Sequence, residues 1–160
     1  MKKLPVRLQA IADYVETGAS VADIGTDHGK LPVYLALKGT ANRIIASDIS
    51  EGSLCAARRL AEKHEVTDKI ELVHAPGLSK LTPTDVNTIV IAGVGGETII
   101  SILTEAPWTT DAVKNNKLKI ILQPQTKLNL LQDYLTKSGM TIKEEKTVLD
   151  RGREYKILLI

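Results

Sequence analysis

The chain has 160 residues, enough for one ordinary domain with a single core, and its formal net charge is only +2. That balance excludes a strong basic field, so an anionic partner would have to meet a local patch of cations. One cysteine excludes an internal disulfide framework, and the absence of a long apolar run or a signal peptide favours a cytoplasmic protein without a membrane partner.

Residues 4–16 place apolar side chains at helical spacing, and Gly18 supplies a stop, so the sequence predicts a first helix there. Lys2, Lys3 and Arg7 lie at its start. A few cations at the end of a helix favour a solvated face over a nucleic-acid contact.

The stretch at residues 20–31, SVADIGTDHGKL, organises the rest of the chain. Residues 21–24 form a short apolar run typical of a strand buried on both faces of a parallel sheet. Gly25 ends this strand, and helical spacing runs from about His28 to Lys38, so residues 25–29 form a strand-to-helix turn. Such turns bind ligands, because free backbone N–H groups and the positive end of the helix dipole point outward.

A second strand is predicted at residues 43–47, and Asp48 ends it, followed by Ile49. An acid at this position can accept hydrogen bonds from both hydroxyls of a ribose. Asp27 stands where a dinucleotide fingerprint requires glycine, and its charge would repel a pyrophosphate. The pattern therefore favours S-adenosylmethionine, which carries a ribose and cationic groups. A nicotinamide-dependent oxidoreductase is the weaker alternative.

The next predicted elements are a helix over residues 53–64 and a third strand over residues 70–74. Cys55 is expected to be a buried small hydrophobe in the helix, and His74 a structural histidine with a backbone partner. Residues 75–78 then form a second loop at the same sheet edge. This loop places Gly77 and Leu78 at the cofactor.

Residues 88–92, TIVIA, are the most apolar strand and are predicted to be central. Ala92 and Gly93 at its end are expected to contact the cofactor. Gly95 and Gly96 are expected to wall the acceptor pocket, although a tight turn that needs positive φ is the alternative interpretation. A helix over residues 97–103 follows, closed by residues 107–108.

A fifth strand is predicted at residues 118–122, with Gln123 and Pro124 after it as substrate-binding candidates. A helix over residues 126–137 and a hairpin around residues 150–152 complete the chain. Five strand–helix units in strict alternation and a hairpin indicate an α/β, doubly wound, mainly parallel sheet with an antiparallel C-terminal hairpin. This arrangement resembles the Rossmann-like class I methyltransferase fold, in which S-adenosylmethionine lies over the first two strands and the methyl acceptor near the fourth.

Three motifs also resemble those of the bacterial TrmK family: DIGTDHGKLP at residues 23–32, IAGVGG at residues 91–96 and ILQPQ at residues 121–125. The resemblance covers nearly the whole chain. It implies a tRNA methyltransferase that acts on N1 of adenosine 22, with S-adenosylmethionine as its cofactor and no metal.

The chain departs from the family pattern in three places. Family members continue past the last strand into a helical extension, whereas this sequence ends at Ile160. Lys30 replaces a frequently aromatic residue, and Pro76 replaces an Asn or Asp before Gly-Leu. We therefore expect a single methyltransferase domain that binds S-adenosylmethionine well and tRNA weakly. Few cations remain for phosphate contacts, namely Lys2, Lys3, Arg7, Arg151 and Arg153.

The expected chemistry is an in-line displacement, in which N1 of adenine attacks a sulfonium methyl group and needs orientation more than activation. An acid near the acceptor would stabilise the cationic adduct and take a proton, and Asp27 is the best-placed candidate. The alternative for Asp27 is a helix cap, and His28 could order the turn. A non-catalytic cofactor-binding module remains the alternative for the whole chain.

Overall fold

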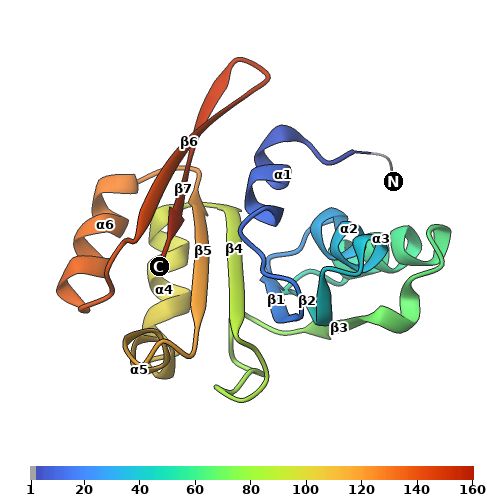
Figure 1. Cartoon of the computed structure of the whole chain (residues 1–160), viewed down its shortest axis with the longest axis horizontal. Coiled ribbons are helices and arrows are strands. Elements are labelled where there is room, and N and C mark those ends of the chain that lie inside the picture. Colours follow the sequence, from blue (N-terminus) through green and yellow to red (C-terminus); the bar gives the residue numbers. More distant parts are fainter. Residues whose placement is uncertain (1–2) are drawn as a thin grey trace.

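The computed structural model describes residues 3–160 and contains one seven-stranded sheet of order β3-β2-β1-β4-β5-β7-β6 (Figure 1). Strands β1 to β5 pair in parallel, and β7 is antiparallel to both of its neighbours. This confirms the predicted mixed sheet. The strands are β1 (Ala19–Ile24), β2 (Ala41–Asp48), β3 (Ile70–His74), β4 (Thr88–Val94), β5 (Lys119–Pro124), β6 (Glu144–Asp150) and β7 (Arg153–Leu159).

Helices cover both faces of the sheet: α4, α5 and α6 group on one side in Figure 1, and α1, α2 and α3 on the other. A hydrophobic core lies on each face of the sheet, and successive residues of one strand pack alternately into the two cores. In β1, Ala22 packs in the cluster beneath α4 and α6, whereas Val21 packs in the cluster beneath α1 and α2. The helices are α1 (Val6–Ala12), α2 (Lys30–Lys38), α3 (Glu51–Lys63), α4 (Gly96–Thr104), α5 (Trp108–Lys114) and α6 (Leu128–Lys137), with a 3₁₀ turn, η1 (Thr67–Lys69).

The central strands are buried on both faces, as their continuous apolar runs predict. Ile89, Val90 and Ile91 of β4 are each fully buried, and β4 is the middle strand of the sheet. The chain order reverses between β1 and β4, because β2 and β3 lie on one side of β1 and β5 on the far side of β4. Ligands bind at such a switch point, outside the carboxyl ends of the strands.

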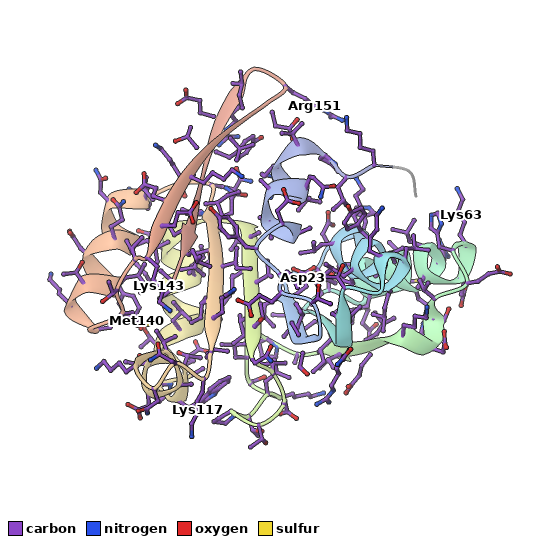
Figure 2. All side chains as sticks on the ribbon, viewed as in Figure 1. Asp23, Lys63, Lys117, Met140, Lys143 and Arg151 are labelled. Carbon is purple, nitrogen blue, oxygen red and sulfur yellow. The ribbon has the colours of Figure 1, made fainter. Side chains whose placement is uncertain are left out.

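The C-terminal hairpin is longer than the part of it that joins the sheet. Strands β6 and β7 pair along their full length, whereas β5 pairs with β7 at Leu158 and Leu159. Arg151 and Gly152 both have positive φ, 51° and 77°, which gives the two-residue turn expected of a right-twisted hairpin. The hairpin projects past the other strands, with Arg151 at its tip (Figures 1 and 2).

Several predicted helices need correction. Helix α1 begins after Pro5 and ends at Ala12, shorter than the predicted 4–16. Residues 107–108 do not simply close α4: Pro107 precedes a further helix, α5, since proline is well tolerated at a helix start. The strict alternation is also wrong, because the described chain has no helix between β3 and β4.

Cys55 is exposed, which corrects the prediction of a buried residue. Helix α3 directs Leu54, Ala57 and Ala61 inward, and the position after Leu54 therefore turns toward solvent. The prediction for His74 is confirmed, since its Nε2 lies 2.8 Å from the carbonyl oxygen of Ile49. Within residues 3–160, none of the helices has the length and apolar character needed to cross a membrane.

Candidate functional site

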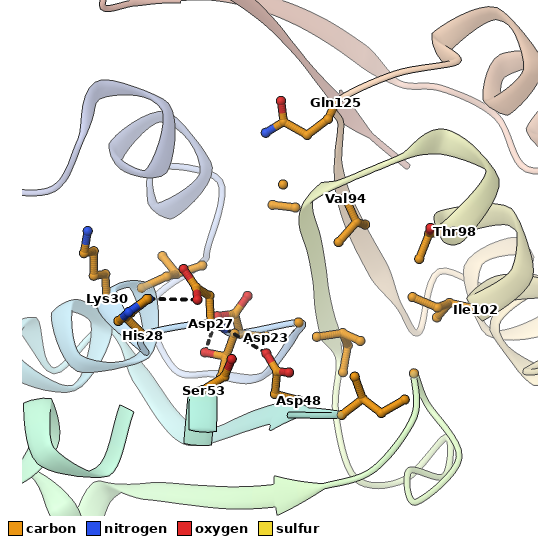
Figure 3. A pocket seen from close by; sticks show the side chains of 18 of the residues that line it. Asp23, Asp27, His28, Lys30, Asp48, Ser53, Val94, Thr98, Ile102 and Gln125 are labelled. Atoms are coloured by element: carbon orange, nitrogen blue, oxygen red, sulfur yellow. Dashed lines mark hydrogen bonds and ion pairs between the residues drawn. The ribbon is translucent and has the colours of Figure 1, made fainter. Parts of the chain in front are cut away.

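A cavity of about 650 Å³ opens at the carboxyl ends of β1, β2 and β4 (Figure 3). Its lining comes from five places: the turn after β1, the end of β2 with the start of α3, the loop after β3, the end of β4 with helix α4, and Gln125 after β5. Helix α1 closes one more side. The site thus lies at the switch point of the sheet, where the fold brings together segments distant in sequence.

The turn after β1 takes its shape from residues in the left-handed region. Gly25, Asp27 and Gly29 have φ values of 73°, 54° and 68°. A Cβ on Gly29 would lie 2.7 Å from the Cβ of Ala57, so a glycine is required for α2 to begin this close to α3. The shape of the turn therefore depends on these left-handed residues and on the close packing of α2 against α3.

Asp48 anchors this turn from the end of β2. Its Oδ2 accepts a hydrogen bond from the backbone N–H of Asp27 at 3.0 Å, and its Oδ1 accepts one from Ser50 at 2.9 Å. The carboxylate is largely buried yet lines the cavity. Since an ionised carboxylate offers about four lone-pair sites, it can still accept hydrogen bonds from a ligand.

Asp23 is a second buried acid on the cavity wall. It is the last but one residue of β1, and the hydroxyl of Thr26 donates to its Oδ2 at 2.7 Å. Burial raises the pKa of Asp23 from 3.8 to about 6, opposed by the Thr26 hydrogen bond and by the charge of Arg7. A cation bound beside Asp23 would stabilise its ionised form.

Asp27 lies at the open side of the cavity, and its carboxylate is 2.8 Å from Nδ1 of His28. Both side chains are largely exposed. The alternative role for Asp27, as cap of the following helix, is not what the structure shows: Gly29 is the N-cap of α2, and within the described chain no side chain caps it. Asp27 is therefore available to a ligand.

The opposite wall is formed by one face of α4. Thr98, Ser101, Ile102 and Glu105 line the cavity at a helical spacing of three and four residues. Figure 3 shows Thr98, Ile102 and Val94 across the cavity from the three aspartates. This wall has one carboxylate, Glu105, against three on the facing side, so the cavity has a carboxylate-rich side and a mixed side.

Arg7 brings a positive charge to the edge of the cavity beside β4. Its Nη1 donates to Oε1 of Gln123 at 2.7 Å, and it would lie 3.5 Å from a Cβ on Gly93. Gln123 is fully buried, and its own amide group donates to the carbonyl of Pro124 at 2.8 Å. The hydrogen bond to Gln123, at the end of β5, thus fixes the position of the Arg7 guanidinium.

The predicted site residues divide into two groups. The cavity lining includes the predicted cofactor residues Gly25, Asp27, His28, Asp48, Ile49, Gly77, Ala92 and Gly93. The remaining predicted residues lie behind the lining rather than in it: Leu78, Gly95, Gly96, Gln123 and Pro124.

The structure gives physical reasons for this second group. Leu78 is buried in the core beneath α4. A Cβ on Gly96 would lie 2.7 Å from the carbonyl oxygen of Lys127, so its glycine allows the start of α4 to approach the loop before α6. A Cβ on Gly95 would meet the Thr126 hydroxyl at 3.0 Å. Gln123 meets the site through Arg7.

The sequence-based assignment considered Arg7 only as a surface cation, and it did not place Asp23, Arg7 or the lining residues of α4 at the cavity. A signal existed for α4, because Thr98, Ser101 and Glu105 recur at helical spacing along one side of a helix that buries Ile99 and Leu103. Arg7 had no such signal, since its partner Gln123 is 116 residues away in sequence.

The arrangement suits a ligand with a ribose and positive charge. Asp23, Asp27 and Asp48 make one side of the cavity negative, which opposes a pyrophosphate and favours a cation. Between residues 3 and 160, no three His, Cys, Asp or Glu side chains form a cluster that could hold a metal ion.

Comparison with known proteins assigns the chain to a family. The family described as "Methyltransferase domain" matches residues 4–158. The tRNA (adenine(22)-N(1))-methyltransferase of Bacillus subtilis is 33% identical over 160 residues, which are 98% of this chain and 64% of that protein. The chain therefore spans about two thirds of this relative's length.

Solved structures agree with this assignment. The crystal structure of the B. subtilis m1A22 tRNA methyltransferase TrmK matches with a TM-score of 0.86 and 33% identity, covering 99% of this chain and 66% of that one. TrmK of M. capricolum, in complex with S-adenosylhomocysteine, matches with a TM-score of 0.81 and 25% identity, covering 98% of this chain and 67% of that one.

Proposed function

The chain belongs to the methyltransferase domain family, and from this premise we propose that it transfers a methyl group from S-adenosylmethionine to N1 of adenosine 22 in tRNA. The observation that carries the proposal is the carboxylate-lined cavity at the β1/β4 switch point, with Asp48 at the end of β2. The relatives named as m1A22 tRNA methyltransferases support the choice of acceptor.

The residues of the cavity fit each part of the cofactor. Asp48 keeps lone pairs for the two ribose hydroxyls, and Ile49 offers an exposed apolar side chain for the adenine beside the loop that contains Gly77. Asp23 provides a buried acid for the cationic end of the molecule. When bound, S-adenosylmethionine supplies an electrophilic methyl group on a sulfonium.

The protein's contribution to the displacement is orientation and charge. In this proposal the acceptor base lies against the glycine-rich end of β4, where Gly93 lines the cavity without a side chain. Methylation of N1 makes the base cationic until N6 loses a proton. Asp27 stabilises this charge and accepts the proton, and its contact with His28 keeps the carboxylate at the cavity's open side.

Two binding titrations and one assay test the proposal. S-adenosylhomocysteine and NAD are titrated separately against the protein by calorimetry, and binding of the first alone is expected. Total tRNA is then incubated with methyl-labelled cofactor and digested for mass spectrometry, which should show new 1-methyladenosine. Tight binding of NAD would favour the oxidoreductase alternative, and cofactor binding without any methyl transfer would favour a non-catalytic module.

The role of Asp27 has its own test. Asp27→Asn preserves the shape of the side chain but removes its charge, so turnover should fall about 100-fold or more while S-adenosylhomocysteine still binds. Asp133→Asn, on the exposed side of α6, is the control for loss of one carboxylate. Unchanged turnover in Asp27→Asn would show that this carboxylate takes no part in the reaction.

A further inference from the structure

Two arginines stack on one tyrosine beside the cavity. The guanidinium of Arg7 lies 5.5 Å from the centre of the Tyr155 ring, and that of Arg153 lies 5.3 Å from it. Arg153 Nη2 also donates to the carbonyl of Gln125 at 3.3 Å. Because Arg7 and Gln125 both line the cavity, this stack connects the C-terminal hairpin to the cavity wall.

The hairpin has further arginines at the same edge of the sheet, at increasing distance from the cavity. Strand β6 ends at the hairpin turn and runs parallel to β5, so the turn lies at the edge where the cavity opens. Arg151 in the turn and Arg153 after it are both exposed, and Figure 2 shows Arg151 at the projecting tip. Arg7, Arg153 and Arg151 thus form a row from cavity to hairpin tip, which we call the arginine row.

The arginine row is held in place yet keeps donors for a ligand. Gln123 and the Tyr155 ring fix the Arg7 guanidinium, and within the described chain its one hydrogen bond goes to Gln123. A guanidinium has five N–H donors, and stacking on an aromatic ring leaves its edge free for oxygen acceptors.

Three acids lie near the arginine row, and within residues 3–160 none of them forms an ion pair with its guanidinium groups. Asp23 is close enough in the cavity to interact with the charge of Arg7, but its hydrogen bond comes from Thr26. Asp150 pairs across the hairpin with Arg153, but its Oδ2 accepts a hydrogen bond from the backbone N–H of Arg7 at 3.4 Å. Glu154 lies between Arg153 and Tyr155 in sequence and therefore points to the opposite face of the strand. The three guanidinium groups therefore outnumber the two nearby carboxylates, Asp150 and Asp23.

On the basis of the proposed function, we propose that the arginine row binds phosphate groups of the RNA strand next to the acceptor adenosine, and that Tyr155 fixes the row relative to the cavity. A base that enters an enzyme pocket must leave its stack, while its sugar–phosphate backbone stays outside. The aspartate side of the cavity repels that backbone. The hairpin side offers planar guanidinium groups, which match phosphate oxygens well.

The experiment compares substitutions in the arginine row with one cation removed elsewhere. Arg151→Asn and Arg153→Gln are made singly and together, and Asn is chosen because it tolerates the φ of 51° at position 151. Lys137→Gln removes an exposed cation from the last turn of α6 as the control. Binding of an unmodified tRNA transcript is measured across a salt series, together with S-adenosylhomocysteine affinity and turnover kinetics.

Each hairpin substitution should reduce the slope of log affinity against log salt by about 1, and raise KM for tRNA with kcat and S-adenosylhomocysteine affinity unchanged. Lys137→Gln should leave the slope unchanged. A double variant with the wild-type slope, or one no different from Lys137→Gln, would overturn the proposal.

The Arg7→Gln variant distinguishes two anions that Arg7 could bind, an RNA phosphate and the carboxylate of the cofactor. Reduced tRNA binding with normal S-adenosylhomocysteine affinity supports the arginine row, whereas reduced S-adenosylhomocysteine affinity would assign Arg7 to the carboxylate of the cofactor and overturn its place in the row. Failure of the proposed function has a different signature. It appears as absent methyl transfer in the wild type, while the salt slopes of the variants still test the RNA contacts.

Discussion

Replacement of Asp48 by alanine should weaken S-adenosylhomocysteine binding by about 2 to 3 kcal/mol, or about 30- to 150-fold in Kd. The carboxylate already accepts two backbone hydrogen bonds, from Asp27 and Ser50, and has lone pairs for two ribose hydroxyls. Hydrogen bonds to a charged acceptor contribute about 1.5 to 3 kcal/mol each. Two such bonds sum to about 3 to 6 kcal/mol, and we take about half of that sum, because water can enter the space left by the side chain and solvate the hydroxyls.

The substitution also removes the acceptor for a backbone N–H in the turn after β1, so a loss of stability must be separated from a loss of affinity. Asp85→Ala is a matched control, because its carboxylate also accepts a backbone hydrogen bond, from Thr82 at 2.7 Å, outside the cavity lining. Calorimetric titration gives the affinity of each variant, and urea denaturation gives its free energy of unfolding. Wild-type affinity in Asp48→Ala, or an equal loss in Asp85→Ala, would refute the ribose assignment.

Two further predictions concern the buried parts of the site. Gly29→Ala should lower the free energy of unfolding by about 2 to 5 kcal/mol, from the left-handed backbone and the close approach to Ala57, whereas Gly39→Ala, with nothing within 4 Å, should lose only about 1 to 2 kcal/mol. Equal losses in urea denaturation would contradict the packing argument. The raised pKa of Asp23, about 6, means that the native state binds more protons than the unfolded state between about pH 4 and 6. The free energy of unfolding should therefore fall by up to about 3 kcal/mol as pH rises through this window, and Asp23→Asn should remove that fall. The same pH dependence in wild type and variant would show that Asp23 does not cause it.

The cofactor side of the site could be predicted from sequence because it depends on local features. The apolar run of β1, the glycines of the turn and the acid that ends β2 each follow from neighbouring residues and the geometry of parallel strands. A parallel sheet brings the ends of its strands to one edge, so Asp48 and the turn could be placed together without coordinates. Eight of the predicted cofactor residues line the cavity for this reason.

The acceptor side could not be predicted in the same way, because its lining depends on contacts between distant segments. Gly96 and Gln123 follow or end strands at the correct edge of the sheet, yet each is covered by neighbouring segments and does not line the cavity. Gly96 meets the backbone of Lys127, and Gln123 holds Arg7 from 116 residues away. Strand position determines which edge a residue occupies, whereas packing of α1 and α6 determines whether it reaches the cavity.

The overall net charge likewise does not show how charged residues are distributed over the surface. The sequence has 21 Lys and Arg and 19 Asp and Glu residues, a balance that by itself argues against any strongly charged surface. The fold separates these charges at one sheet edge. Strand β1, the turn after it and strand β2 contribute Asp23, Asp27 and Asp48, whereas α1 and the hairpin contribute Arg7 and Arg153. Most carboxylates of the cavity therefore lie on the side proposed for the cationic cofactor, and the arginine row lies on the side proposed for the RNA strand. The pairing of distant segments, rather than the overall composition, determines which charges each ligand meets.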